Sequence, residues 1–160
     1  MRILGVMIAQ PATRVRNAAI VVLASWLLGG CGSAPPAADT PATTAVSVAL
    51  NQVGVPYRYG GNTPSGFDCS GLVHFSYAAA GVSIPRTTSG QWAKLSPVDN
   101  RDMRSGDLLF FEISGKMSHV GLYVGDGRFV HAPSSGRTVS IETLDSPFYR
   151  KAFIRAGRPR

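Results

Sequence analysis

The sequence predicts an α+β domain in which short helices come first and an antiparallel β-sheet follows. Two observations carry this prediction. In residues 46–94 apolar side chains recur at helical spacing, whereas after Asp99 short β-branched and aromatic segments alternate with turn residues. The 18 glycines and 11 prolines among 160 residues also fit many turns and short strands better than a helical bundle. A chain of this length is sufficient for one such domain.

The helices and strands can be placed along the chain. The first helix covers residues 46–53, the second follows the N-cap candidate Asp68 and covers 69–80, and the third covers 87–94. Residues 55–67 are rich in glycine and proline and are expected to form a loop. The predicted strands are 107–113, 119–124, 128–132, 139–143 and 153–156.

The first 43 residues are expected to lie outside this domain. Two arginines precede an apolar run at 18–28, which is shorter than the roughly 20 residues that span a bilayer. The run leads into Leu-Gly-Gly-Cys31, which resembles the lipobox of bacterial lipoproteins, where the cysteine is diacylated and becomes the N-terminus. We therefore expect a lipoprotein signal peptide at 1–30, a lipidated cysteine and flexible tether at 31–43, and the folded domain at 44–160. The alternative is a buried N-terminal helix that contains a chance cysteine.

The formal net charge of +7 falls partly in the segment expected to be removed. The remaining excess gathers near the C-terminus, where it forms either a solvated face or a weak attraction to an anionic polymer or membrane surface. No interleaving of aromatic and basic residues predicts nucleic-acid binding. The basic residues of this cluster are Arg150, Lys151, Arg155, Arg158 and Arg160.

Cys69 is the predicted nucleophile. If Cys31 carries lipid, Cys69 has no disulfide partner within the chain, so it is a buried inert residue, a link to another chain or a reactive thiol. Its place in the first turn of a helix favours the reactive thiol, because free backbone N–H groups and the positive end of the helix dipole stabilise an anion. The pKa of the thiol is therefore expected to fall below its reference value of about 8.5.

A cysteine nucleophile needs a base, and the chain offers His74, His119 and His131. His74 lies five residues along the helix of Cys69 and is expected to point away from the thiol. The other two lie on consecutive predicted strands. His119 is therefore the predicted base. His131 is expected to hydrogen-bond the ring nitrogen of His119 that lies farther from the thiol.

This assignment requires that both strand histidines share one face of the sheet. A regular two-residue turn would pair Leu122 with His131 and place the histidines on opposite faces. A three-residue loop with Gly127 in the left-handed conformation, forming a bulge, would instead pair Gly121 with His131. His119 and His131 would then be diagonal neighbours, and we predict this second register.

A single strand histidine is more often a satisfied core residue than a catalytic one, so the case depends on the combination of all three side chains. Cys69, His119 and His131 would also suit zinc. The chain has no C-x-x-C or H-x-x-x-H spacing and no clear fourth ligand. No metal or other cofactor is therefore predicted.

From about Val46 to Arg158 the chain resembles the NlpC-type family of bacterial cell-wall cysteine peptidases, which have a compact papain-like fold. The match is specific at six stretches. They are Pro56–Gly61, Gly66–Val73, Ile84–Thr88 with Gln91, Gly106–Phe111, Ser118–Gly125 and Phe129–Ala132.

The resemblance implies roles for these residues. Cys69 would be the nucleophile, His119 the general base and then acid, and His131 the orienting residue. Tyr57 lies where the family has a tyrosine whose hydroxyl approaches the oxyanion, and the backbone N–H of Cys69 would be a second donor.

The residues beside the nucleophile leave two alternatives open. Asp68 and Ser70 serve either helix capping and turn geometry or substrate binding. Arg86 contacts either a substrate carboxylate or a nearby acidic side chain.

The family acts on murein stem peptides. The lipid anchor and the absence of a wall-binding module resemble small outer-membrane murein endopeptidase lipoproteins such as Spr, which implies hydrolysis of the D-alanyl–diaminopimelate cross-link through an acyl-enzyme. Other relatives cut the γ-D-glutamyl–diaminopimelate bond. Because Gly32 rather than aspartate follows Cys31, the expected location is the periplasmic face of the outer membrane.

Two other functions remain open at this point. The same fold could carry an acyltransferase or amidase, which would be indicated by a long apolar groove beside Cys69. A non-enzymatic scaffold lipoprotein would instead have a buried Cys69 with His119 out of reach. A regulatory partner is conceivable in either case, but the sequence does not identify one.

Overall fold

The computed structural model describes residues 40–160. The predicted signal peptide, Cys31 and the predicted tether as far as residue 39 lie outside the described residues. Within 40–160 no helix is long and apolar enough to span a bilayer. The helices are α1 (Pro41–Leu50), α2 (Cys69–Ala79), α3 (Thr88–Lys94) and α4 (Pro147–Ala152), with a short 3₁₀ turn η1 at Asn100–Asp102.

Two antiparallel sheets accompany these helices. A small hairpin pairs β1 (Asn62–Thr63) with β2 (Gly66–Phe67). The main sheet has the order β3-β8-β4-β5-β6-β7, and each neighbouring pair is antiparallel. Its strands are β3 (Ser96–Val98), β4 (Leu108–Ile113), β5 (Lys116–Gly125), β6 (Arg128–His131), β7 (Ser140–Thr143) and β8 (Phe153–Arg158).

The predicted α+β class is confirmed, with helices first and an antiparallel sheet afterwards. The first helix, however, begins at Pro41, five residues before the predicted start, and it includes residues that we had placed in the tether. The reason is local: the Thr40 side chain accepts a hydrogen bond from the Thr43 backbone N–H in a capping box, and proline occupies the first helical position. The hairpin β1–β2, β3, η1 and α4 were not predicted.

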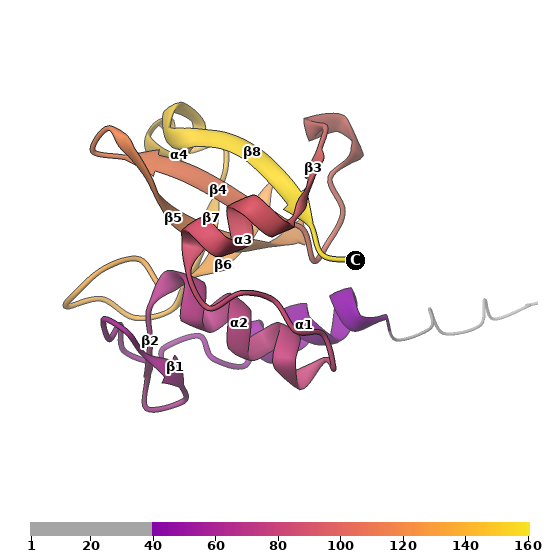
Figure 1. The fold of residues 1–160 in the computed structure, drawn as a ribbon. Helices are drawn as coiled ribbons and strands as arrows, with labels where there is room; N and C mark the ends of the chain where they lie inside the picture. Colours follow the sequence, from indigo (N-terminus) through magenta and orange to yellow (C-terminus); the bar gives the residue numbers. More distant parts are fainter. Residues whose placement is uncertain (1–39) are drawn as a thin grey trace, which may run out of the picture. The chain divides into compact units, whose positions relative to one another are not determined.

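The sheet separates two hydrophobic clusters, because successive side chains of a strand point to opposite faces. Leu108 and Phe110 of β4 pack with α1 and α2, whereas Leu109 and Phe111 pack with residues of α4. In Figure 1, α1 and α2 accordingly lie below the sheet as drawn and α4 lies above it. Both faces of the central strands are therefore covered.

β5 carries two bulges that bracket His119. Against β4, Phe111 pairs with His119 and Glu112 with Met117, so Ser118 is the extra residue. Against β6, the register shifts between Tyr123 and Gly125. Bulges re-aim the neighbouring side chains and increase the local twist of the strand.

The predicted pairing of the two histidine strands is confirmed, but the predicted loop is wrong. Leu122 pairs with Val130, and continuing that register places Gly121 opposite His131. The turn has only two residues, Asp126 and Gly127, both with positive φ (51° and 69°). The extra residue lies in the strand, at the bulge beside Gly125, rather than in the loop.

The two-residue turn generates a first prediction. Gly127→Ala would place a Cβ at φ +69°, a left-handed conformation that costs an L-residue about 1–2 kcal/mol. We expect the free energy of unfolding, measured in urea, to fall by about that amount. Asp126→Asn is the matched control, since asparagine tolerates the same conformation and should change stability little. Equal stability of the Gly127→Ala and Asp126→Asn proteins would contradict the assigned turn.

Candidate active site

Asp68 fixes the start of α2. Its backbone is extended, and its Oδ1 accepts a hydrogen bond of 2.7 Å from the Gly71 backbone N–H. Cys69 is therefore the first residue of the helix, where backbone N–H groups have no partner within the helix. The predicted N-cap and the predicted place of the thiol in the first turn are both confirmed.

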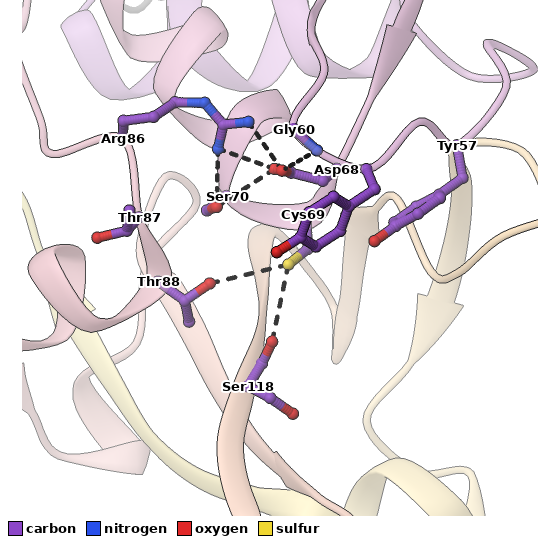
Figure 2. Close-up of a pocket in the computed structure, with 10 residues that line it drawn as sticks. Tyr57, Gly60, Asp68, Cys69, Ser70, Arg86, Thr87, Thr88 and Ser118 are labelled. Atoms are coloured by element: carbon purple, nitrogen blue, oxygen red, sulfur yellow. Dashed lines mark hydrogen bonds and ion pairs between the residues drawn. The ribbon is translucent and has the colours of Figure 1, made fainter.

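Arg86 binds the Asp68 carboxylate through two guanidinium nitrogens. The two guanidinium N–H groups donate to Oδ1 at 2.9 Å and to Oδ2 at 2.8 Å, which is the bidentate geometry of a strong charge-assisted pair. One of them also donates to the Ser70 hydroxyl at 3.0 Å (Figure 2). The other also donates to the Gly61 carbonyl at 3.1 Å. Of the two alternatives for Arg86, the structure thus shows pairing with a nearby acid.

The carboxylate of Asp68 is almost fully used within the protein. Besides Arg86 and Gly71, it accepts hydrogen bonds from the Ser70 hydroxyl at 3.2 Å and the Gly60 backbone N–H at 3.0 Å. Partial burial raises the pKa of Asp68, but the Arg86 guanidinium and the Gly71 N–H outweigh it and hold the pKa below its ordinary value. Asp68 and Ser70 therefore perform the capping and turn roles that were one of their two alternatives.

The loop before α2 lies directly against the helix. A Cβ added at Gly71 would come within 2.0 Å of the Gly61 carbonyl oxygen and 3.0 Å of an Arg86 nitrogen. A side chain at this position would push the loop away from the helix. Gly71 thus allows the loop, Arg86 and the start of α2 to meet at one point.

Cys69 opens into a cleft of about 510 Å³. Its Sγ lies 3.8 Å from the Thr88 hydroxyl and 3.9 Å from the Ser118 carbonyl oxygen, to which the thiol donates (Figure 2). Tyr59, whose relative exposure is 90%, lines the same cleft. The lining residues are Tyr57, Tyr59, Gly60, Asp68, Cys69, Ser70, Arg86, Thr87, Thr88 and Ser118.

The predicted lowering of the thiol pKa is wrong. Burial raises the pKa of the Cys69 thiol, and the negative charge of Asp68 adds to this. The Val120 and Ser70 backbone N–H groups and the Thr88 hydroxyl act in the opposite direction without overcoming burial. The sequence argument counted the helix start but could not see how much of the thiol is removed from water.

His119 and His131 lie on the same face of the sheet, as predicted, and contact each other. Nε2 of His119 and Nδ1 of His131 are 2.8 Å apart, within hydrogen-bond distance. Both side chains are buried, with relative exposures of 5% and 0%. Burial lowers the pKa of His119 to about 4. The pKa of His131 is lowered to about 3, mainly by burial and further by the charges of His119 and Arg137.

The thiol lies against the strand of His119. Sγ lies 3.9 Å from the carbonyl oxygen of Ser118, the residue before His119, and the backbone N–H of Val120, the residue after it, acts to lower the pKa of the thiol. Within residues 40–160, no hydrogen bond joins Sγ to an imidazole nitrogen. Since His131 contacts Nε2, Nδ1 of His119 is the nitrogen left for the thiol.

Tyr57 projects into the cleft beside Cys69 (Figure 2). Burial, followed by the negative charges of ionised Cys69 and Asp68, raises the pKa of Tyr57. Its phenol therefore stays protonated and can donate a hydrogen bond. Its backbone N–H donates to the Arg137 carbonyl at 2.8 Å, which holds this segment against the loop that follows His131.

The third histidine lies outside this cleft, as predicted. Nδ1 of His74 lies 2.8 Å from the Ile84 carbonyl oxygen. Four side chains of the cleft, Tyr59, Thr87, Thr88 and Ser118, were not singled out as site residues. All four lie within the stretches that carry the family resemblance, which was the available signal. Across residues 40–160, no group of three His, Cys, Asp or Glu side chains is arranged to hold a metal ion.

A cysteine at the start of a helix, packed against an antiparallel sheet that carries two paired histidines, defines a papain-like α+β protein. The chain belongs to the NlpC/P60 family, whose model matches residues 54–158. An NlpC/P60 family protein from Bacillus cereus covers 74% of this chain with a TM-score of 0.70 and 35% identity, over 40% of its own length. The NlpC/P60 domain of the peptidoglycan hydrolase SagA covers 72% of this chain and 97% of its own, with a TM-score of 0.63 and 32% identity.

The names of two relatives state different activities. Murein DD-endopeptidase MepH of Escherichia coli is 37% identical over 124 residues, which cover 71% of this chain and 46% of MepH. The γ-D-glutamyl-L-lysine dipeptidyl-peptidase of Bacillus subtilis is 44% identical over 109 residues, covering 66% and 37%. The matched region thus spans less than half the length of these relatives.

The Arg86–Asp68 pair generates a second prediction. Arg86→Met would leave a largely buried carboxylate without its cation, so we expect a loss of about 2–3 kcal/mol in the free energy of unfolding in urea. Arg101→Met is the control, because its pair with Asp99 is exposed and should be worth less than about 0.5 kcal/mol. Similar losses in the two proteins would show that Arg86 does not hold the helix start.

The buried histidines generate a third prediction. Their pKa values of about 4 and about 3 lie below the reference of about 6.5, so the unfolded chain binds more protons than the folded one below about pH 6.5. The free energy of unfolding should therefore fall as the pH is lowered from about 6.5 to about 4. In a His119→Gln, His131→Asn protein this slope should be smaller, and an identical slope would contradict burial of neutral imidazoles.

Proposed function

We propose that this protein is a cysteine-type endopeptidase that hydrolyses an amide bond in the stem peptides of murein. The observation that carries the proposal is the position of Cys69, which begins a helix, opens into a cleft and lies against the backbone carbonyl of Ser118, the residue before His119. The hydrogen-bonded His119–His131 pair supplies the base and its support. The named activities of the NlpC/P60 relatives support murein as the substrate.

The reaction begins from neutral groups. Nδ1 of His119 takes the thiol proton while Sγ attacks the substrate carbonyl carbon, giving a tetrahedral adduct. The Tyr57 hydroxyl and the Cys69 backbone N–H donate to the oxyanion. His119 then gives its proton to the departing amine, and water, deprotonated by the same imidazole, releases the acid product from the acyl-enzyme.

His131 supports this sequence through its contact with His119. For Nδ1 of His119 to accept a proton, the single proton of the neutral ring must sit on Nε2 and be donated to Nδ1 of His131. When His119 becomes imidazolium, the same hydrogen bond remains. The role of His131 is therefore orientation and choice of tautomer, like the third member of other triads.

Within this function, we favour the D-alanyl–diaminopimelate cross-link as the scissile bond. The name of MepH, a murein DD-endopeptidase, supports it, as does the expected form of a small lipoprotein. The name of the Bacillus subtilis relative supports the γ-D-glutamyl bond instead, so the experiment below distinguishes the two.

The cleft does not favour the other two functions. An acyltransferase for lipids would present a long apolar groove, whereas the residues around Cys69 are mostly hydroxyl-bearing or charged. A scaffold would have a buried Cys69 with His119 out of reach, whereas Cys69 lines the cleft and its thiol contacts the strand that carries His119. Lipid attachment at Cys31 and a location on the periplasmic face of the outer membrane belong to this proposal and rest on the N-terminal sequence.

The fourth prediction tests the activity directly. The full chain carrying Cys31→Ala, and therefore no lipid, is incubated with isolated murein sacculi, and the released fragments are identified by mass spectrometry. Loss of cross-linked dimers with intact monomer stems is the expected result, because cross-link cleavage leaves each stem whole. Stems shortened to D-glutamate would instead establish the γ-D-glutamyl bond.

The controls locate the chemistry. Adding Cys69→Ala should abolish product, since no other group in the cleft replaces the thiol. Adding His74→Gln should leave product formation unchanged, because His74 lies outside the cleft. If the protein with Cys69 intact leaves the sacculi unaltered, the proposed activity is wrong.

A further inference from the structure

One ring nitrogen of the catalytic pair has no evident partner. Nε2 of His131 is buried and, among residues 40–160, makes no hydrogen bond. The other nitrogen, Nδ1, contacts His119. Buried polar atoms are normally hydrogen-bonded. Because His131 contacts the proposed base, His119, the state of its unpaired Nε2 can affect that base.

Aromatic rings surround this imidazole. The ring centroid of His131 lies 5.0 Å from that of Phe129 and 5.4 Å from that of Tyr149, with interplanar angles of 62° and 87°. Tyr149 itself packs edge to face against Phe129 at 4.9 Å and against Phe111 at 5.4 Å. Tyr149 comes from α4, on the sheet face opposite α2, and takes no part in the cleft around Cys69.

The two neutral tautomers of His131 differ in what they place at the buried Nε2. With the proton on Nδ1, His131 donates to His119 and leaves a lone pair at Nε2. With the proton on Nε2, His131 accepts from His119 and has an N–H group there. The electron-rich faces of aromatic rings attract an N–H and repel a lone pair.

The choice of tautomer passes on to His119. Only when Nδ1 of His131 accepts does His119 carry its proton on Nε2, and only then is Nδ1 of His119 free to take the proton of Cys69. In the other tautomer, Nδ1 of His119 is already protonated and cannot act as a base. The environment of His131 Nε2 therefore affects whether His119 can act as the base for Cys69.

We infer that Tyr149 is a positioning residue that acts through His131: with Phe129, its ring selects the tautomer protonated on Nε2 and so keeps His119 in its base-competent form. The charged groups nearest this assembly are Arg137 and Glu142, which pair with each other at 3.9 Å. The positive charge of Arg137 adds to burial in keeping His131 neutral. The catalytic part of the inference rests on the proposed function, whereas the tautomer does not.

The fifth prediction uses nitrogen NMR of the full chain carrying Cys31→Ala and labelled in histidine. In this protein both His119 and His131 should carry their proton on Nε2. In Tyr149→Phe the pattern should persist, because the ring remains. In Tyr149→Leu, His131 should shift partly to the tautomer protonated on Nδ1. Phe148→Leu is the matched control, since Phe148 packs on Tyr149 at 5.0 Å and is largely exposed.

Kinetics on soluble cross-linked murein fragments provide the second readout. Tyr149→Leu should lower kcat by about fivefold with little change in KM, because a weak N–H to ring contact is lost and no substrate contact changes. Tyr149→Phe and Phe148→Leu should retain kcat.

Three outcomes overturn the inference: a proton on Nδ1 of His131 in the starting protein, an unchanged tautomer in Tyr149→Leu, or an unchanged kcat in that variant. The first can be observed even if Tyr149→Leu does not fold. If no murein fragment is cut while the tautomers are as expected, the proposed function fails and the assignment of Tyr149 to the tautomer stands.

Discussion

The bidentate pair between Arg86 and Asp68 is the interaction on which the rest of the site depends. Asp68 caps α2, and the guanidinium that neutralises it also reaches Ser70 and the Gly61 carbonyl. One cation thus joins the loop, the helix start and the segment before α3. Cys69 sits between residues held in this way, so the direction of its thiol follows from a network rather than from a single rotamer.

The other half of the site depends on the sheet. The Ser118 bulge interrupts β5 immediately before His119, and a second bulge follows Tyr123. Between them the strand is regular and pairs on both sides, which fixes the face that His119 and His131 share. A strand packed on both faces has little freedom to slip, because a slip of one residue would turn every side chain to the other face and into the wrong packing. The rigid sheet and the capped helix therefore meet where the Ser118 carbonyl approaches the thiol.

The features that could be predicted from the sequence are those set by residues close together in the chain. The Asp68 cap, the start of α2 and the shared face of the histidines depend on neighbouring residues and strand alternation, and they could be predicted. α4 could not, since six residues ending in Arg-Lys-Ala carry no long apolar period. The partner of Arg86 was one of two stated alternatives, because residues 18 positions apart meet only through the fold. The thiol pKa depends on burial, which no local pattern reports.

Burial also determines how the proposed chemistry starts. A thiolate–imidazolium pair would place two charges where the pKa of Cys69 is raised and that of His119 is lowered to about 4, so both groups rest neutral. His119 must then take the thiol proton as the carbonyl is attacked. The charge forms only when Tyr57 and the Cys69 backbone N–H have an oxyanion to bind, so it is stabilised mainly in the transition state. Burial thus keeps the Cys69 thiol protonated at rest, and the thiol loses its proton only when a bound substrate is attacked.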